Sequence, residues 1–467
     1  MLSVQIGKTL EGRALKLKQV IEDYPITCAV SVNGLLANFA VAFTAPTFAV
    51  FALLFTGAVL VKGRHTVTRM ILAAGIRAAH HARFHRFFSQ ARWEMDRLWE
   101  RLVRLIVERL TKPGARIEIV IDETAQKKTG AKIYGVGLVH DNRPAARKGW
   151  NLSWGLTWVV LTLRIRVPLW GGHVFAVPVM ARLCRKEKYG RDGGHLFRTK
   201  AQLAWERVER LVSWVSGCRI RLYVDGGYAD GKFMKALPPN VEVVGRLRHD
   251  AALYGLPPKR RAVRGRPRQH GRRLPNPRER VTRRPGQWTL VELPNGKCCE
   301  VQTWVALWWK VFGARPIRVV ASRVPGRPET VQFFYTTQTA LTPAEALSGY
   351  ADRWAVEGLF HEVKERMGFE DPQCRTERAV ERTTPFLLWT AGGVQYGFLS
   401  RNDPGLIGWR PRGWSHCRRT ERPPSFAQMQ AALRREILTG AFSQRSASKG
   451  ALEENLRALI ETAAYAA

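Results

Sequence analysis

The spacing of apolar residues changes at Pro113 and Gly114, and this change restricts the folds that the chain can adopt. Before it, the run from Arg92 to Leu110 places large apolar side chains among charges at near-helical intervals. After it, the run from Ile117 to Ile121 is apolar and β-branched and ends at Asp122, as expected of a buried strand. We therefore predict a helical segment over residues 1–112, followed by an α/β segment.

The order of elements after Gly114 predicts a mixed α/β sheet. A helix is expected over 199–215, and strands are expected over 117–121, 134–139, 156–167, 173–179, 219–224 and 241–247. Further strands at 288–293, 301–308, 317–322 and 331–336 indicate a β-rich insertion over 249–337. From Thr342 onward the pattern is mostly helical, and Ser425 is expected to cap a helix over 425–438.

The uncharged stretch from residue 24 to residue 61 allows two interpretations. A membrane span needs about 20 continuous apolar residues, but Pro46 divides this stretch and its first half contains several polar residues. We favour buried helices, with Pro46 starting the second one, and keep a membrane anchor as the alternative. Residues 1–23 carry charges throughout, so we expect no signal peptide.

Positive charge dominates the composition. There are 75 Lys and Arg against 38 Asp and Glu, a net charge of +37, which favours a polyanionic partner. A ribosomal protein, a membrane-surface protein or a generally basic proteome would give the same excess. The seven cysteines are irregularly spaced and form no CxxC pair, so neither a zinc ribbon nor a disulfide framework is supported and a reducing cytosol fits best.

Two segments concentrate this charge. Residues 259–284 hold twelve Lys or Arg and one acid, and we expect a mobile or DNA-ordered loop without a core of its own. Within it, Arg264, Arg266 and Arg268 form a short extended segment suited to a minor groove, or more generally to phosphates. The stretch 80–93 mixes basic residues with aromatic ones and predicts an amphipathic helix whose cationic face contacts DNA phosphates or solvent.

Two acidic residues each follow an apolar run, and we expect both to lie at strand ends. Asp122 follows 117–121 and Asp225 follows 219–224. Carboxylates at the ends of adjacent strands project into the same space and repel one another unless cations neutralise them. Because Mg²⁺ prefers oxygen ligands, this pair suggests a metal site.

A third carboxylate is expected on the helix that begins after Thr342. Thr342 and Glu345 have the spacing of a capping box with Pro343 at the first helical position, and the helix is expected to run past Lys364. At about 100° per residue, Arg353, Glu357 and Lys364 fall within roughly 60° of Tyr350. This polar stripe suits a carboxylate for metal, flanked by two cations and a phenol for phosphates.

These residues resemble a known signature. Tyr350, Arg353, Glu357 and Lys364 are similar to the Y-x2-R-x3-E-x6-K signature of bacterial insertion-sequence DDE transposases, and the segments VIDETAQKKTG and YVDGGYAD resemble the first and second Asp regions of that family. Many relatives carry Asp-Asp-Thr at the first site, where this chain has Asp122-Glu123-Thr124. Asp122 matches the metal ligand, and Glu123 is its rival.

The resemblance implies a fold and a division of the chain. It implies a ribonuclease-H-like α/β core interrupted by the β-rich insertion, with a helical N-terminal domain and a helical C-terminal region. The expected segments are a DNA-binding or dimerisation domain at 1–112, the two parts of the core at 113–248 and 338–400, the insertion with the basic loop at 249–337, and the C-terminal region at 401–467.

The resemblance also implies a function. Asp122, Asp225 and Glu357 would be catalytic and would bind two Mg²⁺ ions, with Mn²⁺ as an alternative. Tyr350, Arg353 and Lys364, together with Arg264, Arg266 and Arg268, would contact DNA. The partners would be transposon-end and target DNA and a second copy of the chain in a synaptic dimer, in the bacterial cytoplasm at the nucleoid. Two alternatives keep the fold: a DNA endonuclease that does not transpose, and a non-catalytic DNA-binding protein.

Overall fold

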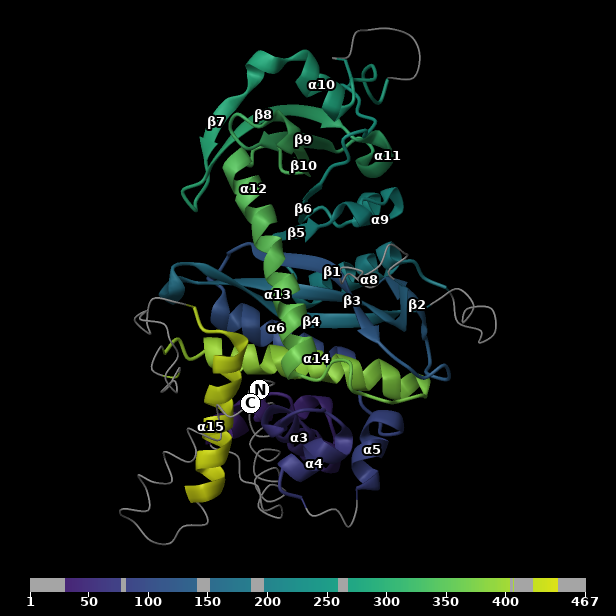
Figure 1. Ribbon diagram of the computed structural model, residues 1–467, viewed down its shortest axis with the longest axis vertical. Helices are drawn as coiled ribbons and strands as arrows, with labels where there is room; N and C mark the ends of the chain where they lie inside the picture. The colour runs from purple at the N-terminus through teal and green to yellow at the C-terminus, as the bar shows by residue number, and fades with distance from the viewer. Residues whose placement is uncertain are drawn as a thin grey trace, which may run out of the picture.

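Helices precede and follow one large sheet. The computed structural model describes residues 30–76, 81–140, 152–185, 197–258, 268–403, 406 and 423–443. In the described part of the N-terminal segment every regular element is helical, as predicted (Figure 1). The elements are α2 (Val30–Ala37), η1 (Ala40–Ala42), α3 (Ala45–Leu60), α4 (Val67–Ala73), α5 (Ala82–Ser89) and α6 (Met95–Leu110).

The uncharged stretch forms buried helices. Pro46 occupies the first turn of α3, as predicted, and most of α3 is buried. A Cβ atom on Gly57 would lie 2.0 Å from the carbonyl oxygen of Met70, so glycine is what allows α3 to pack this closely on α4. In the described part of the chain, no helix is both long and apolar enough to cross a membrane.

The basic and aromatic stretch forms the predicted amphipathic helix. In α5, Phe84, Phe87 and Phe88 are buried, whereas His85 and Arg86 are exposed. The exposed rings of His81 and His85 meet edge to face, with their centroids 6.0 Å apart. His80 lies outside the described residues.

The centre of the sheet has the predicted ribonuclease-H-like arrangement. Strands β1, β3 and β4 are antiparallel neighbours, and β1, β5 and β6 are parallel neighbours. Helix α8 (Lys200–Trp214), which lies within the predicted range 199–215 and is capped by Thr199, separates the antiparallel strands from the parallel ones along the chain. The bounds are β1 (Ile117–Lys127), β2 (Gly137–His140), β3 (Leu152–Val167), β4 (His173–Cys184), β5 (Ile220–Val224) and β6 (Val241–Arg246), with α9 (Gly231–Ala236) after β5.

The β-rich segment continues the same sheet. Strand β10 pairs with β6, so the sheet runs on through β10, β9, β8 and β7 to its far edge in the upper part of Figure 1. The bounds are β7 (Thr289–Glu292), β8 (Cys298–Leu307), β9 (Pro316–Arg323) and β10 (Gln332–Thr336), with α11 (Trp309–Phe312) between β8 and β9.

The expectation of a coreless basic loop is wrong for its second half. Residues 277–283 form the short helix α10 (Pro277–Arg283), which the Asn276 side chain caps and whose Val281 is buried. The cap and the two buried residues Pro277 and Val281 fix this segment on the protein, although its high charge predicted a loop. Arg264 and Arg266 lie outside the described residues, and Arg268 is exposed.

The C-terminal helices join the sheet to the N-terminal helices. They are α12 (Pro343–Ala351), α13 (Ala355–Arg366), α14 (Glu377–Leu399) and α15 (Phe426–Ser443), and Ser425 caps α15 as predicted. Helix α14 lies between the sheet and the helices α3 to α5, whereas α6 packs against both α14 and the sheet (Figure 1). On one side, a Cβ atom on Gly392 would lie 2.8 Å from the carbonyl oxygen of Pro178 in β4. On the other side, the Trp389 ring packs on Phe39 and Phe51, at centroid distances of 4.7 and 5.1 Å.

Replacing Trp389 tests whether α14 is the element that holds the two layers together. Trp389 is 0% exposed, so we expect Trp389→Ala to lower the free energy of unfolding by about 3 to 5 kcal/mol. Urea denaturation followed by circular dichroism would measure this loss. Leu290 is 66% exposed, so Leu290→Ala should change stability by less than about 0.5 kcal/mol; equal losses in the two variants would contradict the prediction.

Candidate active site

Asp122 and Asp225 are neighbours just beyond the point where the parallel pairing of β1 with β5 ends. The last paired residues are Ile121 and Val224, and each aspartate is the next residue along the chain. Asp225 follows β5 directly, as predicted. The expectation that Asp122 ends its strand is wrong, because β1 runs on to Lys127 and places Asp122 opposite Val160 of β3.

The guanidinium of Arg353 joins two of the three predicted carboxylates. Its Nη1 donates to Asp122 Oδ2 at 2.5 Å, and its Nη2 lies 3.6 Å from Glu357 Oε1. The hydroxyl of Tyr350 donates to Asp225 Oδ1 at 3.3 Å. The structure thus brings together five of the residues that the sequence singled out, from β1, the end of β5 and the helices after Thr342.

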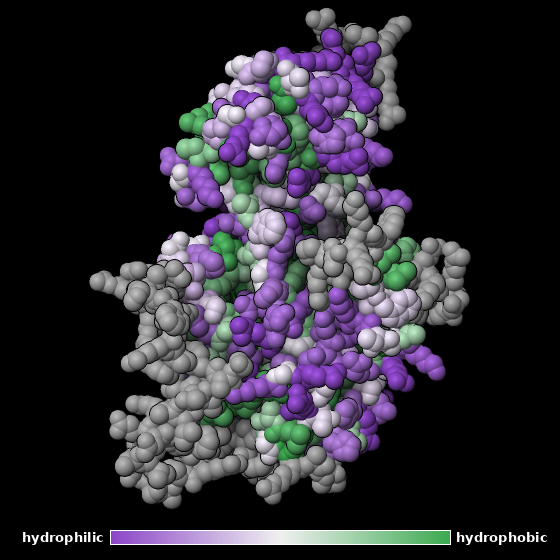
Figure 2. All heavy atoms as spheres, viewed as in Figure 1, coloured by the Kyte–Doolittle hydropathy of each residue, from purple (hydrophilic) through white to green (hydrophobic). Residues whose placement is uncertain are grey.

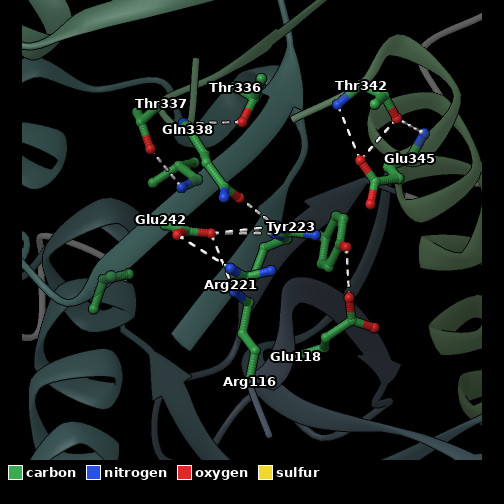
Figure 3. Close-up of polar contacts among 12 residues, drawn as sticks. Arg116, Glu118, Arg221, Tyr223, Glu242, Thr336, Thr337, Gln338, Thr342 and Glu345 are labelled. Atoms are coloured by element: carbon green, nitrogen blue, oxygen red, sulfur yellow. Dashed lines mark hydrogen bonds and ion pairs between the residues drawn. The ribbon is translucent and has the colours of Figure 1, made fainter. Parts of the chain in front are cut away.

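The helix that supplies three of these residues is broken. Thr342 and Glu345 form the predicted capping box at the start of α12 (Figure 3). The expectation of one continuous helix is wrong, because the 3-10 turn η6 (Asp352–Trp354) separates α12 from α13. Tyr350 lies before the break, Arg353 within it and Glu357 after it.

Lys364, the other residue of the signature, lies farther along the chain. It is half-buried on α13, about two turns beyond Glu357. Hydrophilic residues cover the face of the molecule along α13 and much of the upper β-rich part (Figure 2).

Burial and neighbouring charges perturb two of the carboxyl groups. Burial raises the pKa of Asp122, the Arg353 guanidinium opposes this shift, and the nearby Asp225 carboxyl adds to it. Burial also raises the pKa of Glu357, against Arg353 and together with Asp122 and Asp225. Burial raises the pKa of the Tyr350 phenol to about 12, so the phenol stays protonated and can donate at neutral pH.

The donor set fits a hard divalent cation, and Arg353 contacts two of its three carboxylates. Three carboxylates without His or Cys are oxygen ligands of the kind that Mg²⁺ and Mn²⁺ prefer. Within the described ranges, no three His, Cys, Asp or Glu side chains lie close enough to hold an ion as they stand. Since Arg353 contacts both Asp122 and Glu357, its positive charge now compensates the acidic cluster.

Glu123, the rival of Asp122, has a different partner. Its carboxylate forms an ion pair with Lys200 at the start of α8. Neighbouring residues of a strand point to opposite faces of the sheet. Asp122, and not Glu123, therefore shares a face with Arg353 and Glu357.

A buried polar network that sequence reasoning missed ties the loop after α13 to β1. Gln126 is 0% exposed; its Oε1 accepts from Trp158 Nε1 at 2.9 Å and its Nε2 donates to the Phe369 carbonyl. Lys128 Nζ donates to the carbonyls of Glu370 and Pro372, at 2.9 and 2.6 Å. The available signal was a pair of long polar side chains two residues apart, which places both on one face of a strand.

The buried Lys128 predicts a pH dependence of stability. Burial lowers the pKa of its ammonium from 10.5 to about 8, against the nearby Cys374, Glu370 and Asp371. Between these values the unfolded chain binds the proton and the folded chain does not, so stability rises as pH is raised from about 8 to about 10.5.

Comparison with Lys128→Met isolates this contribution. The rise in unfolding free energy of the wild type relative to the variant should be on the order of 3 kcal/mol across this window, because other titrating groups cancel in the difference. Denaturant titrations at several pH values would measure it. A difference that stays constant, or that falls with pH, would contradict the prediction.

Comparisons with known proteins assign the family. The model of the DDE superfamily endonuclease family matches residues 38–309, which is more than half of the chain and includes both aspartates. Comparison with curated proteins gives no match. The solved structure of a piggyBac transposase synaptic complex with hairpin DNA is 9% identical over 90% of this chain and 76% of that chain, with a TM-score of 0.39, a similarity too low to bear on function. The family match shows that the chain belongs to the DDE superfamily of endonucleases.

Proposed function

We propose that this chain is the DDE transposase of an insertion sequence. It binds transposon ends, cleaves DNA and joins the 3′ ends to target DNA by metal-dependent phosphoryl transfer. The observation that carries the proposal is the convergence of Asp122, Asp225 and Glu357 on one side of the sheet, with Arg353 between two of them.

The three carboxylates are the proposed metal ligands. Two Mg²⁺ ions, or Mn²⁺ in their place, would activate water or a DNA 3′-hydroxyl and stabilise the leaving oxygen. Asp122 and Asp225 are held by the sheet, whereas Glu357 lies on α13, where its side chain is more exposed than that of Asp122. No covalent enzyme intermediate is needed, so no Ser, Tyr or Cys is assigned as a nucleophile.

The neighbouring cations and the phenol are the proposed phosphate contacts. Arg353 presents a planar guanidinium, which suits bidentate contact with a phosphate. The Tyr350 hydroxyl, which is protonated at neutral pH as any phenol is, adds a donor, and Lys364 adds a charge farther along α13. Arg264, Arg266 and Arg268 would add further contacts with DNA, which fits the net charge of +37.

The larger assembly follows from the same proposal. Two transposon ends must be brought together, so we propose a homodimer in the complex with DNA, at the bacterial nucleoid. We also propose that the chain is divided into five functional segments, at 1–112, 113–248, 249–337, 338–400 and 401–467.

An endonuclease that does not transpose would cut matched element ends without joining them to a target, and a strand-transfer assay separates the two activities.

Removing any one carboxylate should abolish cleavage. We expect Asp122→Ala, Asp225→Ala and Glu357→Ala each to lower the rate of Mg²⁺-dependent cutting of element-end DNA by at least about 10³-fold, the effect of losing several kcal/mol of transition-state stabilisation. DNA binding, measured by gel shift, should change little.

Glu123→Ala is the matched control, because Glu123 neighbours Asp122 but pairs with Lys200. It should keep cutting within about fivefold of the wild type, the effect of losing an exposed ion pair worth about 1 kcal/mol at most. Full cutting by Glu357→Ala, or loss of cutting by Glu123→Ala alone, would overturn the assignment.

Arg353 and Lys364 should act on DNA-end binding. Hydrogen bonds to charged groups contribute about 1.5 to 3 kcal/mol, so we expect Arg353→Gln and Lys364→Gln each to weaken end binding by about tenfold to a hundredfold. Arg210, exposed on α8 and paired with Asp96, provides the control Arg210→Gln, for which affinity should stay within about twofold. Unchanged binding in the first two variants would rule out the phosphate role.

A further inference from the structure

A buried arginine outside the predicted signature contacts the break between α12 and α13. Arg164 lies on β3, and its side chain is 0% exposed. Its Nη1 donates to the carbonyl of Gly349 at 2.7 Å, and its Nη2 donates to Asp352 Oδ2 at 3.0 Å. Gly349 belongs to the last turn of α12 and Asp352 begins η6, so one guanidinium binds both sides of the point where the helix changes its winding.

Neighbouring strands hold this guanidinium in place. It stacks over the ring of Tyr223 of β5 at 4.1 Å, and its Nη2 lies 3.5 Å from Glu118 Oε2 of β1. The Tyr223 hydroxyl donates to the other oxygen of Glu118 at 2.8 Å, as Figure 3 shows. The guanidinium of Arg164 is therefore buried against an aromatic ring, and its charge is matched by two partly exposed carboxylates, Glu118 and Asp352.

The helix approaches the sheet closely at this point. A Cβ atom on Gly349 would lie 2.6 Å from the Tyr223 hydroxyl oxygen, so only glycine fits without displacing that ring. The carbonyl of Gly349 is thereby within reach of Arg164. An arginine is suited to this place because its fork offers parallel donors to a carbonyl and a carboxylate at once.

The 3-10 turn η6 determines the direction in which the site residues on α13 point. A 3-10 turn advances about 120° per residue and an α-helix about 100°, so three residues of η6 turn α13 by roughly 60° relative to a continuous helix. Tyr350 and Arg353 directly follow the two residues that Arg164 binds, and Glu357 lies one turn further along. A change in this winding would move Glu357 relative to Asp122 and Asp225, which are fixed by the sheet.

We propose that Arg164 is a positioning residue that fixes the break at η6 and thereby orients Arg353 and Glu357 toward Asp122 and Asp225. The inference rests on the proposed metal-dependent function of that site. Arg164 does not itself contact Asp122, Asp225 or Glu357 among the described contacts; it acts through the backbone of Gly349 and the side chain of Asp352.

Arg166, on the same strand, provides a matched control. It forms an ion pair with Asp352 and lies 3.8 Å from Glu118 Oε2, so it faces the same two carboxylates as Arg164. Its side chain is 47% exposed, and solvent can replace its contacts. Comparing the two arginines separates the fixing of the break from the mere neutralisation of Asp352.

The experiment compares the full-length wild type with Arg164→Gln, Arg164→Lys and Arg166→Gln. Calorimetric titration with Mn²⁺ gives the metal affinity without DNA, cutting of element-end DNA gives the Mg²⁺ concentration for half-maximal rate, and thermal melting gives stability. Loss of a residue that orients a metal ligand lowers metal affinity by about 10- to 100-fold, which we expect for Arg164→Gln. The metal affinity of Arg164→Lys should lie between those of the wild type and Arg164→Gln, and the metal affinity of Arg166→Gln should stay within about twofold of the wild type.

The outcomes separate the two proposals. A wild type that neither binds Mn²⁺ nor cuts DNA overturns the proposed function, and the positioning role falls with it. A wild type that does both, with Arg164→Gln unchanged in metal affinity, overturns the positioning role alone. If Arg164→Gln does not fold, Arg164→Lys decides: a folded protein with weakened metal affinity supports the role, and one with wild-type affinity overturns it.

Discussion

The mutual repulsion of the carboxylates that meet where the pairing of β1 with β5 ends is the constraint on which the arrangement of the site depends. The parallel register of β1 and β5 sets Asp122 beside Asp225, and α13 adds Glu357. Three negative groups in a partly buried place need a positive charge. In this conformation Arg353 supplies that charge from the same helical segment that carries Glu357, so the segment brings an acid and its counter-charge together.

This requirement explains why the surrounding contacts concentrate on the two ends of α13. At its start, Arg164, Tyr223 and Glu118 hold the break at η6 against the sheet. Beyond its end, Gln126 and Lys128 hold the following loop to β1 through buried hydrogen bonds. Arg164, Gln126 and Lys128 are buried and lost water on folding, and their hydrogen bonds to protein groups compensate for this loss, except at Arg164 Nε, which has no hydrogen-bond partner. The helix that carries Glu357 is thus fixed at both ends by side chains of the sheet.

Much of the fold could be predicted from local patterns. Apolar runs located the strands, Pro46 and Thr342 located helix starts, and the order of elements indicated a mixed α/β sheet, whereas the ribonuclease-H-like core was implied by the family resemblance. The predictions were wrong where a distant contact overrides the local signal. Strand β1 continues through Asp122 because β3 pairs with it, and α10 forms in the basic stretch around Asn276 and Val281. The helix break carries no proline at residues 349–354, and its partner Arg164 lies far away in the sequence.

The sequence by itself determined which residues are chemically suited to the site. The spacing of Tyr350, Arg353, Glu357 and Lys364, and the two acids after apolar runs, were visible because helical and strand periodicities are local properties. Only the tertiary structure decided how these residues meet: that Arg353 joins Asp122 to Glu357, that Glu123 turns to Lys200 instead, and that Arg164 holds the break between them. These choices depend on register, burial and charge compensation between segments distant in the chain, and no local pattern encodes them.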